Sequence, residues 1–577
     1  MRISGAKIVM ECLLEQGVRT VFGYPGASVI DIYDELYKYR RKIEHILMSH
    51  EQHAAHAADG YARTTGRTGV CIATSGPGAT NLITGIAAAF MDSSPVVFIT
   101  GNVTIPLIGR DSFQEVDITS ISMPVTKNNY MVKDVNKLAE TFREAFLLAA
   151  CGRPGPVLID IPKNILVEKT ELAPPGADIL PDAYYNRLYN DLCIEDIDVL
   201  IDMITTASCP LILAGGGVIR SGASTELAAF AESIDAPVVL TMMGLGAVSS
   251  DARRFIGLVG MHGANASNVA VNECDLLIAV GTRFSDRVTI DVNSFAKNAK
   301  IVHIDIDRAE INKNIRADHH ITGDAKTALA AVISKISAQG VSFDHSGWME
   351  RVQLLKEQAP PLREGNPRNQ GSGRYSEFRN SDITPKAVIE TIHNLTGGNA
   401  IIVTDVGQHQ LWTAQYYRFN KPNTFVTSGG YGAMGFGVGA AIGACFGVRD
   451  SNRDNMQVIL ITGDGSFRMN SMELAVIKQY KLPIITIVFN NRVLGMVRQW
   501  QSLFYERRYS ATNLDRGPDF VKLASAYSID GVCVRSLPEF KSTLSKMLAN
   551  KKPGLIELPI PKDTMVNPMV SANAQFS

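Results

Sequence analysis

Short runs of aliphatic and β-branched residues recur along the whole chain, and stretches with helical spacing separate them. Such runs are typical of strands buried on both faces of a parallel sheet, and their alternation with helices is typical of βαβ units. The pattern therefore predicts an α/β protein built from doubly wound parallel sheets. The predicted strands are residues 20–22, 70–73, 96–100, 157–161, 211–214, 238–240, 276–280, 301–306, 401–404, 458–461, 484–489 and 555–558.

Two segments that lack this pattern divide the chain. Residues 172–183 carry prolines and acids, and residues 359–383 are polar and rich in glycine and proline, so we predict that both are linkers. Three domains of similar size result, which suits a length of 577 residues. The predicted domains are residues 1–165, 190–335 and 384–546, followed by a C-terminal tail, 547–577, that is extended after Pro559.

Composition excludes several classes of function. Acidic and basic residues nearly balance, with a net charge of −1, so we expect no surface for nucleic acid or an anionic membrane. No apolar run reaches the roughly 20 residues that span a bilayer. The richest run, 435–448, is predicted to be a closely packed buried helix because it is full of glycine and alanine. The eight cysteines are scattered, and residues 1–17 suit neither a signal nor a transit peptide, so we predict a cytoplasmic protein.

The strongest chemical signal is Gly463-Asp464-Gly465, which follows one predicted strand, with Asn491 at the end of the next. A helix is predicted between the two strands at residues 469–480. Ligands of open parallel sheets bind at the carboxyl ends of strands, where Asp464 and the Asn491 side chain could meet. Two hard oxygen donors beside glycine N–H groups suit a Mg²⁺ ion that carries a diphosphate. We therefore expect a cofactor site here.

A second signal is the segment from His50 to Arg63, which follows the strand-like residues 46–48. Its three histidines invite a zinc interpretation, but H-E-x-x-H would need histidine at position 54, which is alanine. Positions on an ordinary helix explain the histidines well. They explain Glu51 less well, because an acid that enters an alanine-rich buried helix is costly without a partner. A buried carboxyl is suited to hydrogen-bonding a ring nitrogen and moving protons.

These two segments together resemble the thiamin-diphosphate enzymes of the pyruvate oxidase and decarboxylase superfamily. The resemblance narrows, over nearly the whole chain, to the catalytic (large) subunits of the acetohydroxyacid synthase, or acetolactate synthase, family. It rests further on the strings Gly23-Tyr24-Pro25-Gly26, Thr74-Ser75-Gly76-Pro77-Gly78, Phe113-Gln114-Glu115, Gly152-Arg153-Pro154-Gly155, Gly407-Gln408-His409, Met434-Gly435-Phe436-Gly437 and Leu494-Gly495-Met496-Val497-Arg498-Gln499-Trp500.

The resemblance implies three cofactors: thiamin diphosphate, Mg²⁺ and FAD. Glu51 would hydrogen-bond the aminopyrimidine ring and so promote loss of the proton from thiazolium C2. Mg²⁺ would bind Asp464, Asn491 and the backbone carbonyl of Val493. Further contacts with thiamin diphosphate are implied for Gly26, Gln408, His409, Met434, Gly463, Gly465, Ser466 and Met496.

The resemblance also implies a set of substrate-binding residues. Phe113 and Gln114, in a polar loop, would line the substrate pocket. Lys163 would attract the carboxylate of a 2-ketoacid, and Trp500 would favour a ketoacid acceptor over protonation. The ordinary alternatives are a solvated lysine at a strand end, a tryptophan that only packs and, for Met434, a methionine that fills a gap in the core.

The middle block contains the turn Gly215-Gly216-Gly217, which could admit a phosphate but does not match G-x-G-x-x-G. Here the resemblance implies FAD, with Asp305 on a ribose hydroxyl and arginines on a diphosphate. The alternative is a domain that keeps only an empty groove. The implied FAD residues are Arg153, Gly216, Gly217, Met261, His262, Gly281, Arg283, Asp286, Arg287, Asp305 and Asp324.

The implied activity is decarboxylation of pyruvate and transfer of the two-carbon unit to pyruvate or 2-ketobutyrate. The products, acetolactate or acetohydroxybutyrate, lie in branched-chain amino acid biosynthesis. Halves of the active site from the first and third domains would meet in a homodimer or homotetramer, with room for a small regulatory subunit. Two alternatives stay open: a pyruvate-oxidase-like enzyme that passes electrons to FAD, and a non-catalytic nucleotide-binding module. Ala27 and Asn164 depart from the usual family residues, glycine and aspartate.

Overall fold

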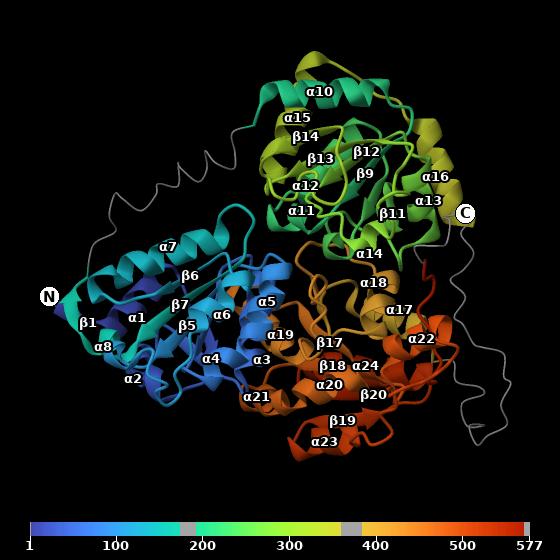
Figure 1. Ribbon diagram of the computed structural model, residues 1–577. Helices are drawn as coiled ribbons and strands as arrows, with labels where there is room; N and C mark the ends of the chain where they lie inside the picture. The colour runs from blue at the N-terminus through green and yellow to red at the C-terminus, as the bar shows by residue number, and fades with distance from the viewer. Residues whose placement is uncertain (1, 173–191, 359–382, 571–577) are drawn as a thin grey trace.

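The computed structural model describes residues 2–172, 192–358 and 383–570, which form three α/β domains around separate parallel sheets (Figure 1). The predicted fold class is thereby confirmed. The predicted linkers and the end of the predicted tail lie almost wholly outside the described residues.

The first domain is a six-stranded parallel sheet with helices on both faces. A short antiparallel pair, β1 (Arg2–Ser4) with β8 (Lys169–Glu171), lies beside it. The sheet order is β3 (Glu44–Leu47), β2 (Thr20–Gly23), β4 (Gly69–Ala73), β5 (Val96–Asn102), β7 (Pro156–Pro162) and β6 (Asn128–Met131). The helices are α1 (Gly5–Glu15), α2 (Ile30–Tyr39), α3 (Glu51–Thr65), α4 (Pro77–Asn81), α5 (Ile83–Met91), α6 (Ile118–Ser122), α7 (Leu138–Ala150) and α8 (Lys163–Val167).

The third domain repeats this topology. Counted in chain order within each sheet, the strands of the first and third domains both run 2-1-3-4-6-5. The third sheet consists of β16 (Phe425–Val426), β15 (Ala400–Thr404), β17 (Gln457–Gly463), β18 (Ile484–Asn490), β20 (Gly554–Pro559) and β19 (Asp530–Cys533). The helices are α17 (Pro385–Thr396), α18 (Gln408–Tyr416), α19 (Gly437–Asp450), α20 (Asp464–Asn470), α21 (Leu474–Gln479), α22 (Gly495–Phe504), α23 (Phe520–Ala526) and α24 (Leu537–Asn550).

The middle domain has a different strand order, 3-2-1-4-5-6 in the same counting, which is the order of dinucleotide-binding sheets. The sheet consists of β11 (Phe255–Leu258), β10 (Val238–Leu240), β9 (Pro210–Ala214), β12 (Leu276–Val280), β13 (Lys300–Asp305) and β14 (His319–Thr322). The helices are α10 (Ile194–Thr206), α11 (Gly216–Arg220), α12 (Ser224–Ser233), α13 (Asn265–Glu273), α14 (Asp286–Thr289), α15 (Ala325–Gln339) and α16 (Ser346–Gln358).

The first and third domains are joined through α3 and α19, which lie side by side (Figure 1). A Cβ on Gly443 of α19 would collide with the backbone of Ala57 on α3, and one on Gly60 of α3 would collide with the backbone of Ala440. Small residues thus let the two backbones touch. The prediction that residues 435–448 form a closely packed buried helix is confirmed.

Two features of the third domain differ from the sequence expectations. Strand β20 lies between β18 and β19, so the sheet extends past the predicted boundary at residue 546. The helix expected at 469–480 is instead two helices, because α20 starts at Asp464 and a 3₁₀ turn, Ser471–Glu473, separates it from α21. Among the described residues after Pro559, none belongs to a strand, as expected for the extended tail.

Candidate functional site

The predicted metal ligands lie together at the carboxyl ends of β17 and β18. Asp464 is the first residue of α20 and is buried, with its carboxylate near the backbone N–H groups of Gly465 and Arg492. Burial raises the pKa of Asp464 to about 7. A buried carboxylate in this condition is poorly compensated by the protein alone, and a divalent cation would supply the missing charge.

Asn491 is also buried and is held in one orientation. Its Oδ1 accepts a hydrogen bond from the Val493 amide at 3.0 Å, and its Nδ2 donates to Gln408 Oε1 at 3.2 Å. Gln408 in turn donates to Gln499 Oε1 at 3.0 Å and to the Thr564 carbonyl at 2.8 Å. The amide oxygen keeps a second lone pair, so Asp464 and Asn491 are a donor set that fits Mg²⁺.

The predicted diphosphate residues lie beside these ligands at the carboxyl ends of β15 and β17, where the strand order reverses. His409 is buried, its Nε2 has no hydrogen-bond partner within the described residues, and burial lowers its pKa to about 3. Its ring lies against Gly463, where a Cβ would come within 2.9 Å of Nδ1. Ser466 donates to the Val406 carbonyl at 2.8 Å. A neutral imidazole with an unused nitrogen fits a phosphate oxygen or a polar cofactor group.

Met434 lies close to this cluster. A Cβ on Gly465 would come within 3.7 Å of Met434 Cε, so both residues lie in one neighbourhood. The segment around Met434 is fixed by Asp405, whose buried carboxylate accepts hydrogen bonds from the Gly435 amide at 2.9 Å and from Asn470 Nδ2 at 3.0 Å. The sequence reasoning missed Asp405, although it follows β15 just as Asp464 follows β17.

Glu51 begins α3, and its partner is Asn81, whose Nδ2 donates to Glu51 Oε2 at 2.9 Å. The carboxylate is partly buried rather than enclosed, and a Cβ on Gly78 would lie 3.1 Å from Oε1. Gly26 and Gly78 both pack on the side chain of Thr74. The structure therefore brings Gly26 and Glu51 together at the carboxyl ends of β2 and β4, the point where the order of the first sheet reverses.

The substrate residues predicted in the first domain lie at its surface. Phe113 is 87% exposed, and Gln114 has a positive φ of 59° and packs against Gly76. Lys163 is half-buried where β7 ends and α8 begins. Trp500 on α22 is 36% exposed and packs on Phe504, with ring centroids 5.1 Å apart, so it is not a core residue.

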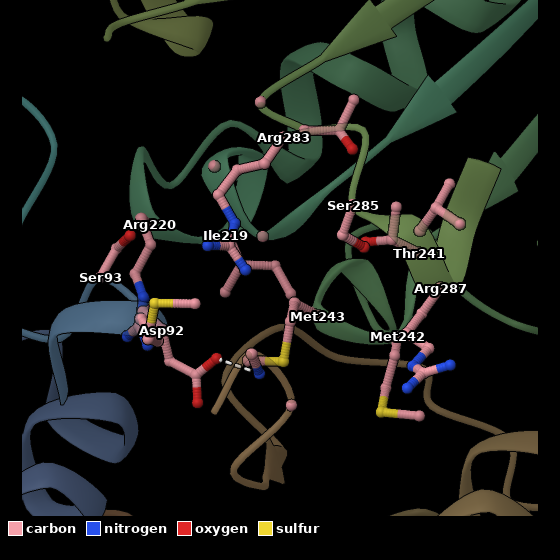
Figure 2. Close-up of a pocket in the computed structure, with 18 of the residues that line it drawn as sticks. Asp92, Ser93, Ile219, Arg220, Thr241, Met242, Met243, Arg283, Ser285 and Arg287 are labelled. Atoms are coloured by element: carbon pink, nitrogen blue, oxygen red, sulfur yellow. Dashed lines mark hydrogen bonds between the residues drawn. The ribbon is translucent and has the colours of Figure 1, made fainter. Parts of the chain in front are cut away.

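A cavity of about 1230 Å³ lies where the three domains meet, and Figure 2 shows part of its wall. Met434, Met496 and Trp500 line it, whereas Glu51, Phe113, Gln114 and Lys163 do not. All the residues that the sequence assigned to FAD line this cavity: Arg153, Gly216, Gly217, Met261, His262, Gly281, Arg283, Asp286, Arg287, Asp305 and Asp324.

The cavity opens at the carboxyl ends of β9 and β12, where the order of the middle sheet reverses. The turns that follow these strands touch through glycine only, because a Cβ on Gly217 would lie 2.6 Å from Gly281 Cα. Arg153 Nη1 is held by Glu310 at 2.7 Å and by Asp307 at 3.1 Å. Asp324 caps α15 through the Lys326 and Thr327 amides, which the sequence reasoning did not foresee. The strand order, the glycine turns and the arginines fit a dinucleotide.

Sequence reasoning missed other parts of the cavity wall. Met242 and Met243 follow β10, and Arg220 ends α11 (Figure 2). Asp92, at the end of α5, binds Arg63 Nη2 at 3.0 Å. A signal existed for the methionines, since they follow a predicted strand end, but none indicated the Arg63–Asp92 pair.

The histidines near Glu51 do not form a metal site. His50 Nδ1 accepts a hydrogen bond from the Gln52 amide at 3.1 Å. His53 Nδ1 lies 2.8 Å from Glu473 Oε1, and His56 packs against Phe436. Among the described residues, no cluster of histidine, cysteine, aspartate or glutamate could hold a metal ion by itself.

Comparison with known proteins identifies three domains of one enzyme family along the chain. Residues 3–121 match the model of the thiamine pyrophosphate enzyme N-terminal TPP binding domain, residues 197–332 that of the central domain, and residues 405–558 that of the C-terminal TPP binding domain. In the described part of the chain, no helix is long and apolar enough to cross a membrane.

Similar proteins cover the whole chain. A probable acetolactate synthase large subunit of Methanocaldococcus jannaschii is 45% identical over 97% of this chain and 92% of its own length. The acetolactate synthase isozyme 2 large subunit of Escherichia coli is 41% identical over 100% of this chain and 99% of its own. The acetolactate synthase large subunit of Lactococcus lactis is 41% identical over 99% and 94%. With three matching domains and identity of this extent, the chain belongs to the thiamine pyrophosphate enzymes and, within them, to the family of acetolactate synthase large subunits.

Proposed function

We propose that this acetolactate synthase decarboxylates pyruvate and transfers the two-carbon unit to a second 2-ketoacid. Pyruvate as acceptor gives acetolactate and 2-ketobutyrate gives acetohydroxybutyrate, so the chain acts in branched-chain amino acid biosynthesis. The observation that carries the proposal is that buried Asp464 and buried Asn491 stand at the carboxyl ends of the neighbouring strands β17 and β18. In a chain of this family, that arrangement suits a metal-bound diphosphate.

Bound thiamin diphosphate supplies the carbon nucleophile and the electron sink for decarboxylation. Asp464, Asn491 and the Val493 carbonyl would hold Mg²⁺, and His409, Gly463, Gly465 and Ser466 would contact the diphosphate. Gln408 orients Asn491 through the 3.2 Å hydrogen bond. Glu51 would hydrogen-bond N1′ of the aminopyrimidine ring, and Met434 would support the two rings from below.

The substrate would lie between surfaces of the first and third domains. Lys163 would attract the substrate carboxylate, and Phe113 and Gln114 would form one wall of the pocket. Trp500 and Met496 would form the opposite wall, since both line the cavity beside Met434. Closure of these apolar walls would exclude water and so disfavour protonation of the two-carbon unit.

The separation of these residues in one chain supports a homodimer or a tetramer built from such dimers. Glu51 and Phe113 do not line the cavity that contains Met434. Each half also exposes large apolar side chains, Phe113 and Met123 (65%) in the first domain and Phe504 (47%) on α22 in the third. Exposed apolar groups near a half-formed site are typical of subunit interfaces. Two copies would place the first-domain half of one against the third-domain half of the other.

FAD would occupy the cavity of the middle domain. The strand order 3-2-1-4-5-6 and the glycine contact at Gly217 support a dinucleotide there. Arg283 and Arg287 would neutralise its diphosphate, and Asp305 would accept from a ribose hydroxyl. This FAD would be structural, since the reaction has no net oxidation.

Two further proposals concern the cellular setting. The names of the relatives as large subunits support a small regulatory subunit as partner. All eight cysteines lie in the described part of the chain and are free thiols, which supports a cytoplasmic location.

An assay of the purified protein with pyruvate, thiamin diphosphate, Mg²⁺ and FAD tests the proposed activity. We expect a product that acid converts to acetoin, formed without oxygen and without an electron acceptor. A pyruvate-oxidase-like enzyme would consume pyruvate only when an acceptor is supplied, and a non-catalytic module would not consume it at all. Either result would overturn the proposal.

A further inference from the structure

Glu473 is a fully buried carboxylate of the third domain whose side-chain partners all belong to the first domain. It ends the 3₁₀ turn Ser471–Glu473 and is 0% exposed. Its two oxygens accept hydrogen bonds from the Ser49 amide at 3.1 and 3.0 Å, and Oε1 lies 2.8 Å from His53 Nδ1. With that nitrogen protonated, His53 is the second donor beside the Ser49 N–H, which the two oxygens share.

These contacts enclose the start of α3, where Glu51 is the first helical residue. Ser49 lies two residues before Glu51, and His53 lies two residues after it. Glu473 therefore binds the backbone N–H of Ser49 on one side of Glu51 and the imidazole of His53 on the other. Glu51 itself turns away toward Asn81. The carboxylate of Glu473 therefore does not touch the proposed catalytic group but fixes the turn that carries it.

A second contact from the same region of the third domain supports this arrangement. Tyr480 directly follows α21, the helix that comes after this 3₁₀ turn. Its hydroxyl accepts a hydrogen bond from the Leu47 amide at 3.0 Å. Leu47 ends β3, so the whole connection from β3 to α3 is held from the third domain.

A buried charge is costly to desolvate, and it persists only where hydrogen bonds satisfy it. Glu473 meets this condition with two donors: the Ser49 N–H, shared between both oxygens at 3.1 and 3.0 Å, and the His53 ring at 2.8 Å. The stability that results is small by comparison with an apolar residue of similar size. What the arrangement does provide is a fixed position for the first turn of α3.

We propose that Glu473 is a positioning residue for the carboxylate of Glu51. It acts through Ser49 and His53. It links the start of α3, which carries Glu51, to the segment of the third domain that begins with Asp464 at α20. The proposal rests on the role proposed above for Glu51. In a homodimer, this link would join the Glu51 of one active site to the metal ligands of the other.

The direct readout is exchange of the C2 proton of bound thiamin diphosphate in D₂O, followed by quenching and proton NMR. This step reports the work of Glu51 without the later steps of the reaction. We expect Glu473→Ala holoenzyme, loaded with thiamin diphosphate, Mg²⁺ and FAD, to exchange about 100-fold more slowly, because a displacement of about 1 Å costs that much. The fall should appear in kcat, with the KM for pyruvate little changed.

Glu473→Gln is the conservative variant. Its amide oxygen can accept from the Ser49 amide, and its NH₂ can donate to His53 Nδ1 in the other tautomer, so exchange should return most of the way to the wild-type rate. If Glu473 acted through its negative charge rather than through its hydrogen bonds, the glutamine variant would exchange as slowly as the alanine variant. That result would contradict the proposal.

Asp450→Ala is the matched control at the other end of α3. Asp450 Oδ2 accepts from Thr20 Oγ1 at 2.8 Å and from the Tyr61 hydroxyl at 3.0 Å, and so also joins the third domain to the first. Its loss should lower the melting temperature and leave exchange at the wild-type rate. Equal slowing in Asp450→Ala and Glu473→Ala would mean general loosening and would overturn the proposal, as would unchanged exchange in Glu473→Ala.

Two further variants keep the outcome decisive. If Glu473→Ala does not fold, His53→Leu removes one donor from the opposite side, and exchange should still slow by about tenfold, a fraction of the full displacement cost; an unchanged rate contradicts the proposal. Glu51→Gln separates this inference from the proposed function. If that variant exchanges as fast as the wild type, the role of Glu51 itself is wrong.

Discussion

The carboxylate of Asp92 accepts a hydrogen bond from the Gly430 amide, 2.6 Å away, and so joins the end of α5 to the loop that leads to Met434 (Figure 2, dashed line). The other carboxylate oxygen binds Arg63 of α3 at 3.0 Å. Both Asp92 and Gly430 line the large cavity of the middle domain. This contact therefore connects the first and third domains at the edge of the proposed FAD site.

Replacement of Gly430 by alanine should weaken FAD binding. A Cβ there would lie 2.7 Å from Asp92 Oδ1, 2.9 Å from the Met91 carbonyl and 2.9 Å from Arg283 Nη2, so the methyl group would push the wall of the cavity apart. We expect a loss of about 1–3 kcal/mol, the usual cost of an overpacked site, measured as a rise in Kd by flavin fluorescence. Gly347→Ala on α16, where a Cβ meets nothing within 4 Å, should bind FAD as the wild type does.

Asp464→Asn should separate cofactor binding from stability. The variant removes a buried negative charge, so the cofactor-free protein should melt at a higher temperature than the wild type. The affinity for thiamin diphosphate in the presence of Mg²⁺ should fall at least about 10-fold, as disturbed metal sites do. Calorimetric titration and thermal melts measure the two effects. A variant that binds the cofactor normally would remove Asp464 from the metal site.

Glu51→Gln should abolish nearly all carboligation and leave the fold intact. Glutamine keeps the size of the side chain and can still meet Asn81, so the start of α3 should be unchanged. Its carboxamide cannot exchange a proton with the ring nitrogen of the cofactor. At least the 10²–10⁴-fold contribution typical of acid–base groups should therefore be lost. The colorimetric assay for acetoin measures this loss, while binding of thiamin diphosphate serves as the internal control.

The apolar pattern found the inner strands of the sheets and missed the edge strands for a physical reason. All the predicted strands are the four inner members of the three six-stranded sheets. Inner strands are buried on both faces and read as continuous apolar runs. The edge strands β6 (Asn128–Met131) and β19 (Asp530–Cys533) are half exposed and carry polar residues, so no run marks them. Only β3 at an edge was noticed, as the strand-like residues 46–48.

Prediction of the site shows the same division. Asp464 and Asn491 were predicted because each stands at the end of a predicted strand, where the topology of parallel sheets brings strand ends together. Glu473 and Asp92 stand at helix ends, and their partners lie 424 and 338 positions away along the chain. No pattern in the local sequence predicts such pairings. They follow only from the way α3, α5 and the third domain pack.

The crossing of α3 and α19 should tolerate no side chain at its closest point. Gly443→Ala would drive a methyl group into the backbone of Ala57, and neither backbone can move without the helix that carries it. The expected loss of stability is about 1–3 kcal/mol or more, measured by urea unfolding. Gly447→Ala, one turn later, meets only the Thr64 and Thr65 side chains at 3.0–3.2 Å, so its effect should be clearly smaller.

His56 should make the protein sensitive to mild acid. It is 0% exposed, both ring nitrogens lack partners within the described residues, and burial lowers its pKa to about 3. Burial is the main cause of this low pKa; the neighbouring His53 and Arg63 add to it, whereas Asp59 opposes it. Between pH 6.5 and 3, the unfolded chain therefore binds a proton that the folded chain does not, and stability falls as the pH falls.

His56→Leu should remove this pH dependence. From pH 7.5 to pH 5, the wild type should lose about 2 kcal/mol more stability than the variant, since the linkage slope for one proton is about 1.4 kcal/mol per pH unit. Urea midpoints across this range measure the difference. Phe436→Leu, which removes the ring packed on His56 at 5.1 Å, should lower stability at every pH and keep the wild-type slope. Parallel curves of stability against pH for the wild type and His56→Leu would show that the imidazole is protonated in the folded protein. A group that binds its proton in both the folded and the unfolded chain contributes no pH dependence to stability.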